Sequence, residues 1–163
     1  MPLSRRALVS RSAWALPVVT LAVAAPAASA SGAPVVDLGA FRLAGQCPIP
    51  SIRTAGFVLT AGDVPLPAGT SVALSSTGSS RRLVSWSPSP AEAVQLVAAG
   101  VTSAWELTVD LGPGASITFR ATGSIQNPFE FTGTVDPAGD AIGTGSRSTA
   151  TITTDFIGGC TAT

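Results

Sequence analysis

The chain contains no histidine and no tyrosine, and it contains no lysine, because all nine of its basic residues are arginine. A Ser-His-Asp triad therefore cannot be assembled from it, and the histidine ligands typical of zinc and copper sites are missing. A catalytic cysteine would lack the histidine that usually serves as its base. Since no cofactor motif is present either, we predict a non-enzymatic protein without cofactor or metal.

Charge is also scarce, because only 11% of the residues are charged. Three arginines precede Ala30, whereas all nine acidic residues and the other six arginines follow it, which leaves a formal charge of −3 after Ala30. A nucleic-acid-binding protein needs a basic patch that neutralises phosphates. We therefore expect no nucleic-acid partner.

The first thirty residues have the organisation of an export signal. A short segment with Arg5, Arg6 and Arg11 precedes an Ala-, Val- and Leu-rich stretch over residues 13–27. Ala28-Ser29-Ala30 then matches the small-x-small pattern of a signal cleavage site, with Ala28 and Ala30 as the two small residues. These features predict a signal peptide over residues 1–30 and one domain over residues 31–163.

Residues 4–9, Ser-Arg-Arg-Ala-Leu-Val, resemble the twin-arginine export motif, although the lysine that usually follows is missing. The resemblance implies export by the twin-arginine machinery through Arg5 and Arg6. A general secretory signal that carries adjacent arginines is the alternative. Pro17 and Pro26 argue against a retained spanning helix, so we expect a secreted or surface-associated protein without a transmembrane segment.

After the signal, apolar and polar residues alternate with the period of two that is typical of half-buried strands. The clearest stretch runs from Trp105 to Thr122 and is interrupted by Gly112-Pro113-Gly114-Ala115, which predicts a β-hairpin with one apolar face. Further strands are expected over residues 35–43 with a bulge near Gly39, 56–60, 71–75, 83–87, 129–135 and 149–153.

Residues 90–99 fit two structures equally well. A capping box at Ser89 with Pro90 at the first helical position favours a short helix, and Val94, Leu96 and Ala98 also fit a strand. About eight short strands at this spacing predict an all-β fold, a single antiparallel β-sandwich.

Two turns carry a family resemblance. Residues 111–119, Leu-Gly-Pro-Gly-Ala-Ser-Ile-Thr-Phe, resemble a hairpin of immunoglobulin-like and conserved-repeat domains of bacterial surface and secreted proteins, and Val64 to Thr70 is similar to another of their loops. The resemblance implies an immunoglobulin-like sandwich. The chain departs from the members that carry an isopeptide cross-link, because that link needs a lysine.

Cys47 and Cys160 are the only cysteines, and both lie in the part predicted to be exported. In an oxidising compartment such a pair is expected to form a disulfide. The alternative is two free thiols that the fold keeps apart.

Several acidic side chains are candidates for a catalytic or metal-binding site. Two carboxylates among Glu106, Asp110 and Glu130 would suit a glycoside hydrolase, but solvated strand faces explain them better. Residues 136–140, Asp-Pro-Ala-Gly-Asp, offer oxygens to calcium but lack the ligand spacing of a calcium loop, and a turn is the simpler interpretation.

The tryptophans of the exported part, Trp86 and Trp105, could stack on a sugar, although their aliphatic neighbours favour core packing. Arg81-Arg82 could contact an anionic wall polymer or be merely solvated. We expect a structural or binding role, with the export machinery and a cell-envelope or extracellular polymer as partners. A carbohydrate- or wall-binding module is the alternative, and a carboxylate-dependent hydrolase is less supported.

Overall fold

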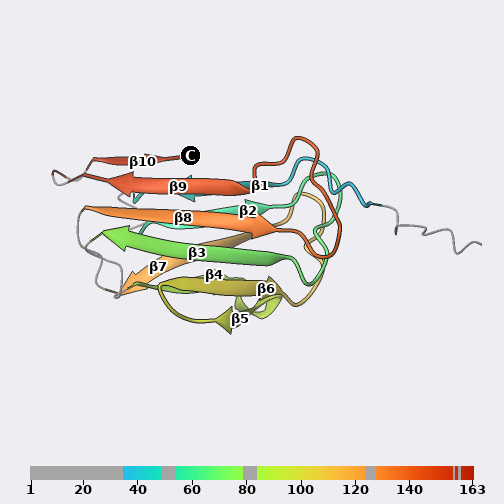
Figure 1. Ribbon diagram of the computed structural model, residues 1–163, viewed down its shortest axis with the longest axis horizontal. Helices are drawn as coiled ribbons and strands as arrows, with labels where there is room; N and C mark the ends of the chain where they lie inside the picture. The colour runs from blue at the N-terminus through green and yellow to red at the C-terminus, as the bar shows by residue number, and fades with distance from the viewer. Residues whose placement is uncertain (1–34, 49–53, 79–83, 124–127, 156, 158) are drawn as a thin grey trace, which may run out of the picture. The chain divides into compact units, whose positions relative to one another are not determined.

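The computed structural model describes residues 35–48, 54–78, 84–123, 128–155, 157 and 159–163, all within one compact unit, Gly32–Thr163. The strands form two antiparallel sheets (Figure 1). The four-stranded sheet has the order β1 (Arg42–Gln46), β2 (Gly56–Thr60), β7 (Ser116–Gly123), β4 (Val84–Ser89). The six-stranded sheet has the order β10 (Cys160–Ala162), β9 (Thr149–Thr154), β8 (Phe129–Asp136), β3 (Ser71–Gly78), β6 (Thr102–Leu107), β5 (Val94–Ala98).

The core lies between the two sheets and is filled by alternate residues of each strand. In β8, for example, Phe129, Phe131, Gly133 and Val135 are buried while the residues between them are not. Aromatic rings join the sheets, because the ring of Trp86 in β4 lies 5.2 Å from that of Phe131 in β8. The predicted all-β sandwich is confirmed, and the period of two reflects one buried face on each strand.

The predicted hairpin over Trp105–Thr122 is wrong. β6 ends at Leu107 and belongs to the six-stranded sheet, whereas β7 begins at Ser116 in the four-stranded sheet. The residues between them cross from one layer to the other, and Val109, expected on the apolar face, is 56% exposed. Alternation reveals that one face is buried, but both sheets bury a face against the same core, so the pattern cannot tell which sheet a strand joins.

Two other segments depart from simple expectation. Of the two structures left open for residues 90–99, the strand is the one observed, because β5 covers Val94–Ala98. The short helix is not formed: a three-residue 3₁₀ turn (η1, Ala91–Ala93) without a side-chain cap precedes the strand. The strand expected over residues 35–43 begins only at Arg42, and Gly39 adopts a positive φ of 65°. Among the described residues before Arg42, one isolated bridge is formed, between Asp37 and Ile142, because the turn at Gly39 interrupts a continuous ladder.

β1 and β10 meet along one side of the sandwich. The Gly45 N–H of β1 donates to the carbonyl oxygen of Thr163, the residue after β10 (2.7 Å). The Leu43 N–H donates to that of Arg147, which lies just before β9 (2.7 Å). The Cys47–Cys160 disulfide joins these strands with a Cα–Cα distance of 5.9 Å, so the predicted pairing is confirmed. The predicted export signal, with Arg5, Arg6, Ala28 and Ala30, and Arg81-Arg82 lie outside the described residues.

Candidate functional site

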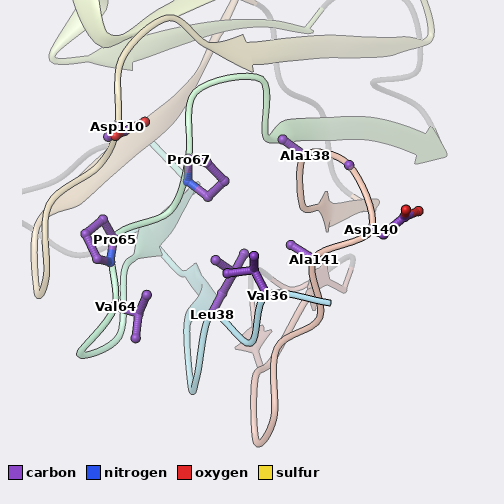
Figure 2. Close-up of a pocket in the computed structure, with 10 residues that line it drawn as sticks. Val36, Leu38, Val64, Pro65, Pro67, Asp110, Ala138, Asp140 and Ala141 are labelled. Carbon is purple, nitrogen blue, oxygen red and sulfur yellow. The ribbon is translucent and has the colours of Figure 1, made fainter. Parts of the chain in front are cut away.

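A hollow called here the end pocket has a volume of about 670 Å³ and lies among loops of the sandwich (Figure 2). Four chain segments build it: residues before β1, the β2–β3 loop, the β6–β7 loop and the β8–β9 loop. Its lining consists of Val36, Leu38, Val64, Pro65, Pro67, Asp110, Ala138, Gly139, Asp140 and Ala141. Apart from the two aspartates, every lining side chain is apolar.

The β2–β3 loop is held by the loop between β6 and β7. Leu66 is fully buried and exchanges two backbone hydrogen bonds with Leu111, at 3.0 Å and 2.8 Å. The prolines on either side of it have fixed φ angles and donate no backbone hydrogen bond. Burial of Leu66 therefore leaves Val64, Pro65 and Pro67 at the pocket wall, in a loop with little conformational freedom.

The opposite wall joins the segment before β1 to the β8–β9 loop. The Leu38 N–H donates to the Ile142 carbonyl oxygen (2.7 Å), and the Ile142 N–H donates to that of Val36 (2.9 Å). Asp37 Oδ1 accepts hydrogen bonds from the Thr144 N–H (3.0 Å) and the Gly39 N–H (2.9 Å). These contacts fix Val36 and Leu38 against the pocket.

The hydrogen bonds to Asp37, first from Thr144 and then from Gly39, hold the pKa of its carboxyl below the ordinary value of 3.8. Because the pKa is lowered in the folded state, the ionised carboxylate stabilises that state above pH 3.8. That contribution is lost as the pH falls through the lowered value. Hydrogen bonds to an ionised, solvent-exposed side chain thus hold this wall of the pocket in place.

The two carboxylates of the end pocket do not converge. Figure 2 shows Asp110 and Asp140 on opposite sides, with Pro67 and Ala138 between them. Asp110 Oδ1 accepts a hydrogen bond from the Ala68 N–H (2.8 Å), so it also ties the β6–β7 loop to the β2–β3 loop. The other candidate acids lie elsewhere, because Glu130 lines a separate hollow beside Pro128 and Glu106 does not line the end pocket.

The segment considered for calcium, residues 136–140, is a turn with Gly139 at a φ of 66°. Asp136 is the last residue of β8, and only Asp140 of its two aspartates reaches the end pocket. Within the described part of the chain, no group of three or more His, Cys, Asp or Glu side chains is placed to hold a metal ion. The segment contributes to the pocket wall rather than forming a ligand cage.

Both tryptophans point into the sandwich. Trp86 is 7% exposed and packs against Phe57 and Phe131, so its predicted place in the core is confirmed. Trp105 is half-buried, its ring lies 6.1 Å from that of Phe119 in the other sheet, and its buried Nε1 has no hydrogen-bond partner among the described residues. Neither ring lines the end pocket or forms an exposed stacking platform.

The end pocket itself was not predicted from the sequence. The sequence assigns its parts to separate features: Val64 to Thr70 to a family-like loop, Asp110 to a candidate acid and Asp136 to Asp140 to a candidate calcium turn. The one available signal was the set of valines and prolines in loops that are otherwise polar, because exposed apolar clusters often mark binding surfaces.

No protein-family model, curated protein or solved structure matches this chain. In the described ranges, no helix is long and apolar enough to cross a membrane.

Proposed function

We propose that the protein is an exported, non-enzymatic binding protein that holds an amphiphilic ligand, with its apolar part in the end pocket. The observation that carries this proposal is an apolar hollow of about 670 Å³ whose walls come from four chain segments. Ligand pockets are typically of this size and are lined mostly by apolar groups with a few polar groups that orient the ligand. Hydrogen bonds fasten two of these walls, so little ordering is needed on binding.

The aspartates indicate the chemistry of the ligand. Asp110 and Asp140 are exposed and stand on opposite sides of an otherwise apolar lining. Among the described residues, no basic side chain lines the pocket. The aliphatic body of a cationic amphiphile would be buried against the apolar lining, and its cationic group would pair with a carboxylate.

The proposal of export rests on the signal-like first thirty residues and on the disulfide. Disulfides persist in oxidising compartments and are rare in the cytosol. The family-like turns support the same setting, because the domains they resemble are surface and secreted proteins. We extend the proposal to an immunoglobulin-like relationship on those turns and on the two-sheet architecture.

The alternatives have less support. A carbohydrate-binding module that stacks sugars needs exposed aromatic rings, and Trp86 and Trp105 both face the core. An anionic wall polymer would be repelled at the pocket by the carboxylates of Asp110 and Asp140. A hydrolase that uses two acids needs them on either side of one bond, and Asp110 and Asp140 are separated by apolar residues.

A set of amphiphiles that share a dodecyl tail tests the proposal. We expect the trimethylammonium amphiphile, below its micellar concentration, to bind with one-to-one stoichiometry in calorimetric titration, and the sulfate amphiphile to bind at least about tenfold more weakly. Ala138→Trp should fill the pocket and weaken binding by at least about tenfold. Ala91→Trp, at an exposed position in η1, is the matched control and should bind normally.

Binding that survives Ala138→Trp, or equal binding of cationic and anionic amphiphiles, would contradict the proposal. Asp110→Asn combined with Asp140→Asn should remove the preference for the cationic probe but keep the binding of the tail. This result would separate the role of the carboxylates from that of the apolar lining.

A further inference from the structure

The described strands present four sheet edges, and three of them are protected against pairing with another chain. β1 and β10 cover one another through the Gly45–Thr163 hydrogen bond, and β10 is only three residues long. β4 contains Pro88, which has no N–H to donate, and Pro90 follows it. Short strands, prolines and covering contacts are the usual means by which proteins keep sheet edges from pairing.

The fourth edge belongs to β5, which is the last strand of the six-stranded sheet, at the opposite end from β10 (Figure 1). It pairs with β6 on one side, and none of the described strands pairs with its other side. A row of backbone donors and acceptors is therefore open along this edge.

Three apolar side chains at this edge are exposed, two of them in β5 and one in the turn between β5 and β6. Leu96, Val97 and Val101 have exposed fractions of 49%, 59% and 41%. The chain carries no charged residue from Ala93 to Trp105, although charges are the commonest protection of a natural edge strand. A strand that combines open backbone groups with exposed aliphatic side chains is a site for β-strand addition.

We propose that two copies of the chain associate through β5, edge to edge and antiparallel across a two-fold axis. A two-fold contact places the same strand against itself, so the occupant must complement its own edge. β5 meets that requirement, because apolar side chains oppose apolar side chains and no like charges face one another in the uncharged segment. Each sandwich then contributes its six-stranded sheet to one continuous sheet.

The irregular register of β5 against β6, between Leu96 and Ala98, limits the length over which two copies of β5 can pair. Val97 is the extra residue of a bulge against β6, and a bulge increases the local twist of its strand. Pairing is therefore short and centred on Leu96 and Val97. A contact of this size falls at the low end of stable interfaces, so the dimer is weak and forms with increasing concentration. Because the other edges are protected, association stops at two copies.

Sedimentation of the purified, oxidised protein over a wide concentration range tests this inference. We expect the average mass to rise from that of a monomer toward that of a dimer and not beyond. Val97→Lys should keep the protein monomeric over the same range, because two ammonium groups would face one another across the axis. Val109→Lys, at a valine of similar exposure in the β6–β7 loop, is the matched control and should dimerise as the wild type does.

A charge exchange distinguishes self-pairing from other effects of the substitution. Val97→Glu alone should also be monomeric, whereas an equimolar mixture of Val97→Lys and Val97→Glu should restore a dimer that contains one copy of each. If Val97→Lys fails to fold, Gln95→Lys serves instead, because Gln95 is exposed and lies opposite Glu106 of β6.

Three results would overturn the inference. They are a wild-type chain that stays monomeric up to its solubility limit, a dimer that Val97→Lys leaves intact, and growth into species larger than a dimer. A monomer that binds a different protein through β5 would show that the edge is used but that its occupant is not a second copy.

Discussion

Gly56 of β2 leaves no room for a side chain beside the backbone of its neighbour β7. A Cβ at this position would overlap the Phe119 carbonyl oxygen and lie 3.3 Å from Arg120 Cα. Backbone atoms of a central strand cannot move aside as the end of a side chain can. Gly45 in β1 is similarly constrained, because a Cβ there would lie 2.7 Å from Ile152 Cγ1 in the other sheet.

We expect Gly56→Ala to destabilise the protein by about 2–3 kcal/mol, because the added methyl group forces β2 and β7 apart. The free energy of unfolding in urea measures the effect. Gly112→Ala is the matched control, since a Cβ at Gly112 meets nothing within 4 Å. The control should change the free energy of unfolding by less than about 0.5 kcal/mol. Equal stability of the two variants would show that the close approach at Gly56 carries no cost.

At the scale of elements, the strand β10 is held by its short ladder with β9 and by contacts to β1. β10 has three residues. The residue after it, Thr163, donates its N–H to the Thr151 carbonyl oxygen (3.0 Å) and accepts the hydrogen bond from Gly45. The Cys47–Cys160 disulfide fixes the start of β10 beside β1. These interactions close one side of the sandwich.

Removing the disulfide by Cys47→Ser together with Cys160→Ser should destabilise the protein by about 2–5 kcal/mol, because the cysteines are 113 residues apart and the bond restricts a long loop in the unfolded chain. Amide hydrogen exchange should also accelerate at Gly45 and Thr163, whose N–H groups bond across this side. Unchanged exchange at both amides would show that β10 is held without the disulfide.

The amide of Leu111 provides the internal control for that measurement. It bonds to Leu66 at the loop end of the sandwich, away from the cysteines. Its exchange should follow the change in global stability only, whereas that of Gly45 and Thr163 should exceed it.

At the scale of the whole molecule, the two proposed surfaces lie on different parts of the sandwich. The end pocket is built by loops, whereas the β5 edge runs along a strand, and no residue of β5 lines the pocket. Ligand binding and self-association can therefore be tested separately.

The intact mass of the protein recovered from culture medium tests export and cleavage together. We expect a species that begins at Ser31 and is lighter by two hydrogens than the reduced chain, because the cysteines are joined. The membrane fraction is the control and should contain little of the chain. A full-length species confined to membranes would contradict cleavage and indicate that residues 13–30 act as an anchor.

Local patterns in the sequence were sufficient for part of this structure. The alternation in Gly56–Thr60 and in Phe129–Val135 predicted strands that are observed, because a half-buried strand imposes its period of two on its own residues. The cysteine pairing followed from there being only two cysteines, both in the part of the chain predicted to be exported. The all-β class and the disulfide were thus determined by the sequence alone.

Only the tertiary structure decided how these parts combine. Residues 105–122 carry the pattern of a hairpin, yet Leu107 and Ser116 end and begin strands of different sheets, because both sheets bury residues in one shared core. The end pocket depends on loops that are distant in sequence, and the exposure of β5 depends on its being the last strand of its sheet. Such properties arise from long-range packing, which neighbouring residues in the sequence do not encode.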